Sequence, residues 1–78
     1  MLNLDDAKLE KHSVTLSGHR TSITLEAGFW RALKAIAKAR GMSLNELIRQ
    51  LDEARNGGLS GAIRVFVLQE AQTHRLDR

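Results

Sequence analysis

The feature that most constrains the fold of this 78-residue chain is a change of hydrophobic parity inside one β-rich stretch. Val14 and Leu16 occupy even positions, whereas Ile23 and Leu25 occupy odd ones. Alternation with a period of two is typical of a half-buried strand. One flat strand cannot change the parity of its buried face without turning its apolar residues toward water. Gly18 lies at the break, and we therefore predict a bulge or a turn at this glycine.

Downstream of residue 25, the spacing of apolar residues predicts helices over residues 27–40, 43–55 and 59–74. Gly41 follows the first helix at a position that requires a left-handed backbone. The second helix begins at Ser43-Leu44-Asn45-Glu46, which matches a capping box. In this motif the serine oxygen accepts from the amide of Glu46, and the glutamate reaches back to the serine amide. The predicted apolar stripes are Phe29, Leu33, Ile36 and Ala37 with Trp30, then Leu44, Leu47, Ile48 and Leu51, then Leu59, Ala62, Ile63, Phe66 and Val67.

The third segment is the ambiguous one, because residues 63–68 also have strong strand propensity. We favour a helix, since the segment is longer than a usual strand and continues into Gln69-Glu70-Ala71-Gln72. With Val65 and Leu68 included, this helix is apolar on nearly all sides, which predicts burial by more than one neighbour. Residues 1–11 are polar and mixed in charge, and we interpret them as a loosely ordered arm in which residues 4–10 could form a marginal helical turn. This arm precedes a single domain over residues 12–78.

A strand over residues 20–25 needs a pairing partner, because a lone strand leaves its backbone hydrogen bonds unsatisfied. If it is the only strand beside the first helix, we expect the partner to come from a second copy related by a two-fold axis. A two-stranded ribbon of this kind fits the major groove of DNA. The predicted inward side chains are Thr21, Ile23 and Leu25, and the predicted outward ones are Arg20, Ser22 and Thr24.

Composition agrees with a small oligomeric binding protein. A chain this short buries only roughly 60% of its unfolded surface, and it has no cysteine for a disulfide, yet it is 42% hydrophobic. We therefore expect a homodimer whose second copy completes the core. The net charge of +3 favours an anionic partner. An acidic N-terminus and the lack of an apolar run of ~20 residues predict a cytoplasmic protein that does not contact membranes.

The sequence does not predict an enzyme. Its carboxylates are scattered, and their spacing assembles no set of nucleophile, base and orienting group. His12, His19 and His74 lack the spacing of a helical metal site, although His12 and His19 flank Gly18 and a strand-borne ligand pair there is conceivable. We therefore expect no catalytic residue, no metal and no cofactor.

The alternating residues 21–25, together with Gly41-Met42-Ser43-Leu44-Asn45-Glu46-Leu47-Ile48, resemble the ribbon-helix-helix superfamily. That superfamily includes repressors of the Arc and MetJ kind and many antitoxins. The sequence is most similar to a subfamily of short, uncharacterised bacterial proteins over about residues 12–70. The similarity rests on Gly18-His19-Arg20-Thr21-Ser22, on Leu25-Glu26 with Phe29-Trp30, and on Arg64-Val65-Phe66-Val67-Leu68. The resemblance implies a mainly helical fold with a short β-ribbon, here extended by a third helix.

The resemblance also implies site residues on double-stranded DNA. Outward strand residues would contact bases, namely Arg20, Ser22 and Thr24. The start of the second helix would bind phosphate through Ser43, Leu44 and Asn45, because free amides at a helix N-terminus form an anion site. Lys34 is a further candidate phosphate contact. We expect the dimer interface at Ile23, Leu25, Trp30, Ile48 and Phe66.

The implied function is a sequence-specific transcriptional repressor that occupies an operator. Two alternatives stay open: an antitoxin-type regulator, and a protein-interaction module of the same fold that does not bind DNA. The extra stretch at residues 13–17 is not part of the minimal family core. Whether residues 13–17 or 20–25 enter the groove is therefore open as well.

Overall fold

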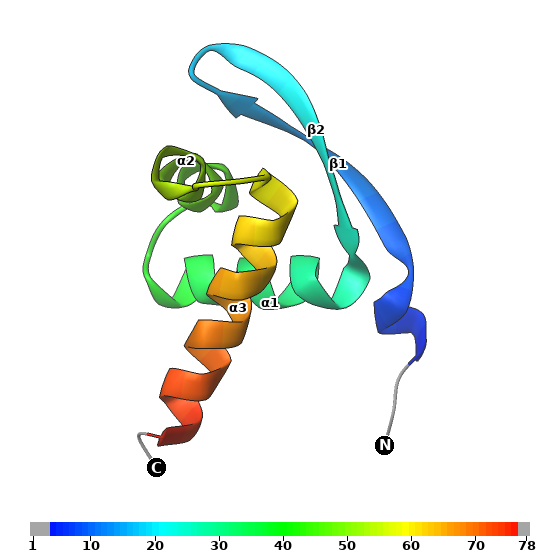
Figure 1. Ribbon diagram of the computed structural model, residues 1–78, viewed down its shortest axis with the longest axis vertical. Helices are drawn as coiled ribbons and strands as arrows, with labels where there is room; N and C mark the ends of the chain where they lie inside the picture. The colour runs from blue at the N-terminus through cyan, green and yellow to red at the C-terminus, as the bar shows by residue number, and fades with distance from the viewer. Residues whose placement is uncertain (1–3, 77–78) are drawn as a thin grey trace.

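A computed structural model describes residues 4–76 of the chain, with side chains described through residue 73. A short 3-10 helix, η1 (Leu4–Ala7), precedes strands β1 (Leu9–Leu16) and β2 (His19–Glu26). Helices α1 (Ala27–Ala39), α2 (Leu44–Ala54) and α3 (Leu59–Leu76) follow. In Figure 1 the two strands form a twisted ribbon that arches over the three helices. The three predicted helices are confirmed, each within two residues of its expected ends.

The two strands pair antiparallel around a turn of two residues, Ser17 and Gly18. Both turn residues have positive φ, 52° and 80°, which is the backbone of the tight hairpin turn whose twist matches that of the flanking strands. Leu16 pairs with His19 across the turn, so even positions on β1 lie opposite odd positions on β2. The change of hydrophobic parity is therefore explained by a turn and not by a bulge.

Within the chain the partner of β2 is β1, so β2 is not the only strand, and the condition under which a second copy was expected to supply its partner is not met. The sequence did not reveal the full extent of this pairing, because β1 is longer than the alternating pattern suggested. The strand begins at Leu9, so residues 9–11 are paired strand and not part of a loose arm. Residues 4–7 of the expected arm form η1, which contacts α1, and residues 1–3 lie outside the described part of the chain.

The two helix boundaries that the sequence predicted in detail are present. Gly41 has a φ of 69°, and the amide of Met42 donates to the carbonyl of Ala37 at 3.0 Å, which closes α1 in the expected manner. The Ser43 hydroxyl oxygen accepts from the amide of Glu46 at 3.1 Å. The reciprocal half of the predicted capping box differs, because the carboxylate of Glu46 accepts from Arg49 instead.

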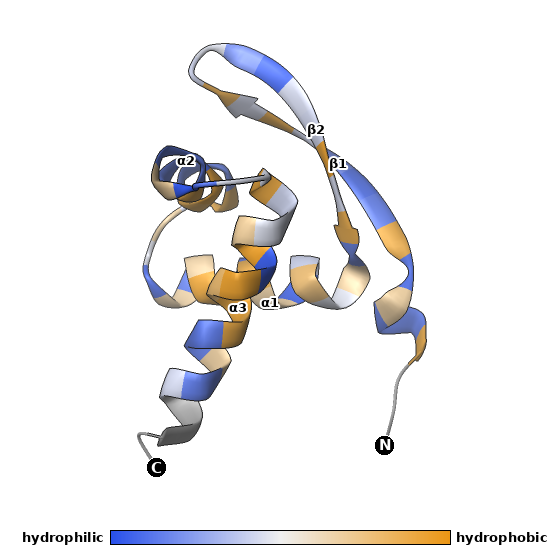
Figure 2. Cartoon of the chain, in the orientation of Figure 1, coloured by the Kyte–Doolittle hydropathy of each residue, from blue (hydrophilic) through white to orange (hydrophobic). Residues whose placement is uncertain are grey.

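One hydrophobic core lies between the inner face of the ribbon and the helices (Figure 2). Its polar groups are satisfied: the indole Nε1 of Trp30 donates to the carbonyl of Glu10 at 3.0 Å. Among the described residues, no buried side-chain nitrogen or oxygen lacks a hydrogen-bond partner. The buried core residues are Val14, Leu16, Ile23, Leu25, Trp30, Leu33, Ala37, Leu47, Ile48 and Ile63.

Helix α3 is confirmed as a helix, and it packs against more than one neighbour, as predicted, because it contacts α1, α2 and β2. The side chains of Val65 and Leu68 are nevertheless 53% and 54% exposed, so the side of α3 that carries them is not covered by the described part of this chain. Within residues 4–76, no helix is both long enough and apolar enough to cross a membrane.

Candidate nucleic-acid interface

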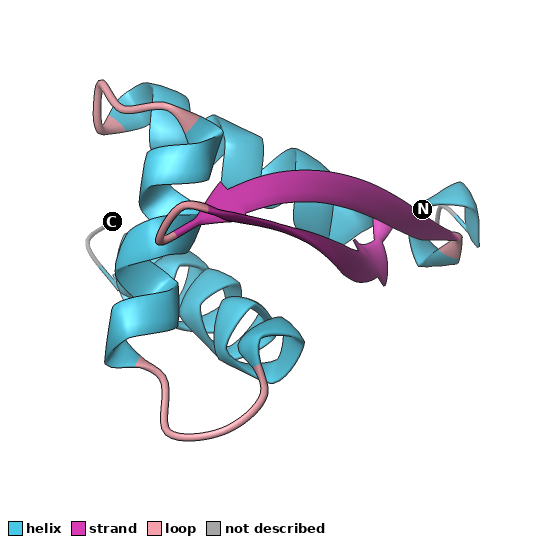
Figure 3. Ribbon diagram, turned by 90° about the horizontal axis from the view of Figure 1, so that it is seen from above, coloured by secondary structure: helices cyan, strands magenta, loops and turns pink. Residues whose placement is uncertain are grey.

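The outer face of the ribbon is a polar surface built from both strands. Residues paired across an antiparallel ribbon point to the same side. Three such pairs, Thr15 with Arg20, Ser13 with Ser22, and Lys11 with Thr24, alternate with the inward positions. A fourth pair of the same parity, Leu9 with Glu26, lies where the ribbon joins α1, and its carboxylate bonds to Arg64. In Figure 3 the ribbon, seen from above, lies across the helices. All six side chains are exposed, and none is a carboxylate: Lys11, Ser13, Thr15, Arg20, Ser22 and Thr24.

These side chains have the chemistry of a base-reading surface. A two-stranded ribbon fits the major groove, where an arginine can bond bidentately to guanine and hydroxyls can contact base edges. Arg20 lies near the turn and Lys11 lies toward the other end, with hydroxyl groups between them. We refer to the six residues Lys11, Ser13, Thr15, Arg20, Ser22 and Thr24 as the ribbon outer face.

The sequence left open whether residues 13–17 or residues 20–25 enter the groove. The ribbon outer face contains residues from both stretches. Ser13 and Thr15 share one face with Arg20 and Ser22, whereas Ser17 lies in the turn. Lys11 was missed by sequence reasoning, because it falls in the residues interpreted as an arm. The signal that could have found it is the register: a turn of two residues at Ser17 and Gly18, continued outward, places Lys11 opposite Thr24.

Because successive side chains of a strand point to opposite faces, the buried positions of the ribbon determine which residues face outward. Ile23 and Leu25 are buried, as expected for inward residues. Thr21, also expected inward, lies opposite Val14 on that side but is exposed. It lines an open hollow together with Arg55, the residue that follows α2. The apolar anchoring of β2 therefore begins at Ile23.

The first turn of α2 is joined directly to the ribbon. The Asn45 side chain accepts from the backbone amide of Thr15 at 3.0 Å through Oδ1, and donates to the carbonyl of Thr15 at 2.8 Å through Nδ2. This pair occupies both backbone polar groups on the outer edge of β1 at Thr15. The Asn45 side chain, predicted to contact a phosphate, thus holds the first turn of α2 against the strand in this structure.

At this end of α2, the groups that can bind an anion are the backbone amides of the first turn. The first amides of a helix have no intrahelical acceptor and carry the positive end of the helix dipole. Ser43 caps one of them, on Glu46, as described above. The amides of Leu44 and Asn45 belong to the same first turn. Because Asn45 ties this turn to Thr15, an anion bound here would sit at a fixed position relative to the ribbon outer face.

Ion pairing divides the basic residues into two groups. Arginines on the helices pair with acids: Arg31 with Asp6, Arg40 with Glu70, Arg49 with Glu46 and Glu53, Arg55 with Asp52, and Arg64 with Glu26. Hydrogen bonds from Arg64 lower the pKa of the Glu26 carboxyl, and those from Arg49 lower the pKa of the Glu46 carboxyl. Within the described residues, Lys11, Arg20 and Lys34 form no ion pair. The uncompensated positive charge therefore includes both cations of the ribbon outer face.

Other predicted residues have roles inside the single chain. Ile23, Leu25, Trp30 and Ile48, expected at a dimer interface, are 4%, 0%, 1% and 0% exposed. Their burial is complete without a second copy, because the chain's own helices and ribbon cover them. Phe66 is half-buried against the same core.

The histidines are not brought together. His12 contacts Glu10 at 3.2 Å, and its ring lies 4.2 Å from that of Trp30. His19 lies opposite Leu16, four positions along β1 from His12, a separation of about 13 Å at the rise of a strand. The side chain of His74 lies outside the described part of the chain. In that described part, no group of three or more potential metal ligands gathers at one place.

A β-ribbon followed by two helices that meet at a glycine turn is the architecture of a ribbon-helix-helix domain. The chain belongs to this family: the family model of the ribbon-helix-helix domain matches residues 9–71. The family in general consists of DNA-binding regulators that dimerise.

Among solved structures, the fold is similar to that of an uncharacterized protein from Bordetella pertussis Tohama I, with a TM-score of 0.86 and 26% sequence identity. The alignment covers 97% of this chain and 66% of that one, so the chain spans slightly less than two thirds of the length of the Bordetella protein. No curated protein matches the sequence.

Proposed function

We propose that this protein is a sequence-specific DNA-binding regulator that acts as a homodimer in the cytoplasm, binds an operator and represses transcription. It is a binding protein and not an enzyme. The observation that carries the proposal is the ribbon outer face. Two unpaired cations and four hydroxyl side chains, without a carboxylate, stand on a ribbon that is anchored from below by buried apolar residues.

Each residue of the surface has a role in this proposal. Arg20 donates to a guanine in the major groove, while Ser22 and Thr24 contact neighbouring base edges. Ser13 and Thr15, on β1 of the same ribbon, contact further base edges. They extend the set of base-contacting residues expected from the sequence. Lys11 contributes a base or phosphate contact at the far end.

Phosphate binding positions the ribbon in the groove. The amides of the first α2 turn, at Leu44 and Asn45 after the Ser43 cap, bind a backbone phosphate. Lys34, exposed on α1, neutralises a flanking one. The Asn45–Thr15 hydrogen bonds set the distance between this anion site and the base-reading surface.

Selection of bound sequences from random duplex DNA, followed by affinity measurements on the selected site, tests the proposal. Arg20→Ala should cost about 1–3 kcal/mol per lost guanine contact and relax the preference at that base pair. Lys38→Ala is the matched control, since Lys38 is an exposed cation on α1 away from the ribbon. It should weaken binding only slightly and on all sequences alike. If no sequence is enriched and no duplex is bound at low salt, the proposal is refuted.

A protein-interaction role is favoured by a separate observation, the exposed apolar side of α3 at Val65 and Leu68. Contiguous exposed apolar surface marks contacts with other proteins. The two roles are compatible if the partner is a second copy of the chain. A variant that loses α3 contacts but keeps duplex binding would separate them.

A further inference from the structure

We propose that Asn56 is a site of intramolecular deamidation, at which the side-chain amide is lost as ammonia and aspartate or isoaspartate is formed. Asn56 lies in the loop of residues 55–58 that joins α2 to α3, and Gly57 and Gly58 follow it. The proposal concerns the covalent chemistry of the chain. It therefore does not rest on the proposed function, and it can be tested without DNA.

The reaction consumes only water. The backbone nitrogen of Gly57 loses its proton and attacks the side-chain carbonyl carbon, Cγ, of Asn56. A bond forms between this nitrogen and Cγ, the Cγ–Nδ2 bond breaks, and the amide group leaves with the proton as ammonia, which closes a succinimide ring. Water then adds to either ring carbonyl and breaks the bond from that carbonyl to the ring nitrogen. Such an intramolecular attack proceeds where the two reacting atoms can approach each other.

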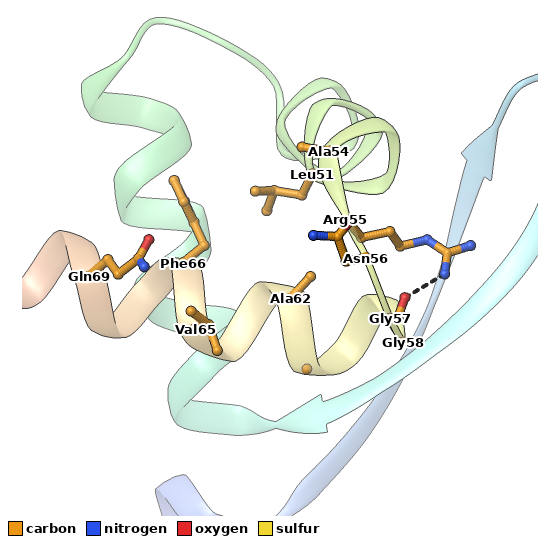
Figure 4. Close-up of a pocket in the computed structure, with 11 residues that line it drawn as sticks. Leu51, Ala54, Arg55, Asn56, Gly57, Gly58, Ala62, Val65, Phe66 and Gln69 are labelled. Carbon is orange, nitrogen blue, oxygen red and sulfur yellow. Dashed lines mark hydrogen bonds between the residues drawn. The ribbon is translucent and has the colours of Figure 1, made fainter.

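The reacting groups at Asn56 are free and accessible to water. In the described part of the chain, neither the backbone amide of Gly57 nor the Asn56 side chain takes part in a hydrogen bond. Both residues are exposed and line an open hollow between the end of α2 and α3, which Figure 4 shows. They also lie outside the two helices, so no helical hydrogen bond holds their backbone in place. The approach of the Gly57 nitrogen to Cγ of Asn56 therefore breaks no described contact of either group.

Glycine at position 57 favours the attack. A side chain there would crowd the attacking nitrogen and would restrict the backbone rotations that bring it to Cγ, whereas glycine has neither effect. The fold does not require glycine at this position. Gly57 has no positive φ, and a Cβ atom built on it would meet no atom within 4 Å. Gly57 can therefore be replaced by alanine to test the chemistry without disturbing the structure.

Asn45 carries the same side chain in a place where every reacting group is engaged. Its Oδ1 and Nδ2 atoms bond to the backbone of Thr15 at 3.0 and 2.8 Å. The amide of the next residue, Glu46, donates to the Ser43 hydroxyl oxygen at 3.1 Å. Attack at Asn45 therefore requires these bonds to open first, and the chain contains its own control for the reactivity of Asn56.

Deamidation changes the loop between α2 and α3 in two ways. Either product replaces a neutral amide by a carboxylate, which lowers the net charge of +3 by one. Isoaspartate also leads the backbone through the side-chain carbon, which lengthens the loop by one C–C bond of about 1.5 Å. The guanidinium of Arg55 donates to the carbonyl of Gly57 at 2.6 Å and to Asp52 at 2.7 Å. We expect the longer backbone of isoaspartate to move the Gly57 carbonyl away from Arg55 and to loosen the junction of the two helices.

The test is peptide mapping by mass spectrometry of the full chain after incubation in neutral and in mildly alkaline buffer. We expect deamidation at Asn56, with methyl labelling by an isoaspartyl methyltransferase, and a faster reaction at the higher pH because the attacking nitrogen must lose its proton. In the folded chain Asn45 should react at least about tenfold more slowly than Asn56. Gly57→Ala should keep the circular dichroism and melting temperature of the wild type and slow the reaction of Asn56 several-fold. A reaction as fast in Gly57→Ala as in the wild type overturns the proposal.

Denaturation separates the effect of the fold from that of the local sequence. In urea at the same pH, Asn45 should react at least about tenfold faster than in the folded chain, because its hydrogen bonds are lost, whereas the rate at Asn56 should change by less than about threefold. An Asn56 that reacts only in urea would show that the folded loop blocks the attack, and the proposal would be wrong. Equal rates at Asn45 and Asn56 in the folded chain would also overturn it.

Discussion

The hydrogen bonds between Asn45 and Thr15 give the sharpest prediction about the candidate site. Asn45→Ala removes one accepted and one donated bond, at 3.0 and 2.8 Å. An intramolecular hydrogen bond contributes about 0.5–1.5 kcal/mol net, so the pair would contribute about 1–3 kcal/mol. Both bonds are exposed, and water can replace the lost partners. We therefore expect the free energy of unfolding to fall by about 1–2 kcal/mol, in the lower part of that range.

Urea denaturation measures this loss, and amide hydrogen exchange locates it. In Asn45→Ala the amide of Thr15 should lose its protection, whereas amides that pair β1 with β2 should keep theirs. Gln50→Ala is the matched control, because the Gln50 amide bonds only to Glu46 on its own helix. It should change stability by less than about 0.5 kcal/mol.

Asn45→Ala also distinguishes the positioning of the first turn of α2 from the recognition of bases by the ribbon. Asn45→Ala should weaken binding to a selected duplex, because the first turn of α2 is no longer held at a fixed distance from the ribbon. It should leave the base preference unchanged, since the ribbon outer face is intact. Unchanged stability together with full protection of Thr15 would refute the reasoning, and so would a changed base preference.

Three further predictions concern the cap, the turn and the acid pH range. Ser43→Ala should lower stability by about 1 kcal/mol in thermal denaturation, and a larger loss in DNA affinity than in stability would support phosphate binding at that helix end. Gly18→Ala should cost about 1–2 kcal/mol, because φ is +80° there; equal melting temperatures would contradict this. Arg64 lowers the pKa of the Glu26 carboxyl, so the ion pair stabilises the fold above the ordinary carboxyl value and is lost as pH falls through the lowered one. Denaturation at a series of pH values should therefore show less acid sensitivity in Glu26→Gln.

Local rules explain why much of the fold could be predicted. Gly41 ends α1 and Ser43 begins α2, and each acts on the helix end next to it in sequence. Both boundaries could therefore be predicted from the sequence. The inner face of the ribbon followed from alternation at Ile23 and Leu25. The parity break correctly located the turn at Gly18, because the side-chain period of a strand is two.

The parts that could not be predicted depend on distant or non-periodic contacts. The first half of β1 has no alternating apolar residues, because Leu9, Glu10 and Lys11 are all exposed, and residues 9–11 were therefore interpreted as part of an arm. The bonds of Asn45 to Thr15 join residues 30 positions apart, and no spacing rule connects them. Hydrophobic patterns also show that a side chain is buried without showing by which chain, which is why Trp30 and Ile48, members of the predicted apolar stripes, were also expected at a dimer interface.

The closure of the ribbon within one chain has a consequence for folding. Its strands are joined by two residues, so they meet at little cost in loop-closure entropy, and their pairing should proceed at a rate that does not depend on protein concentration. A copy of the chain with a different set of outward side chains would therefore still close its own ribbon.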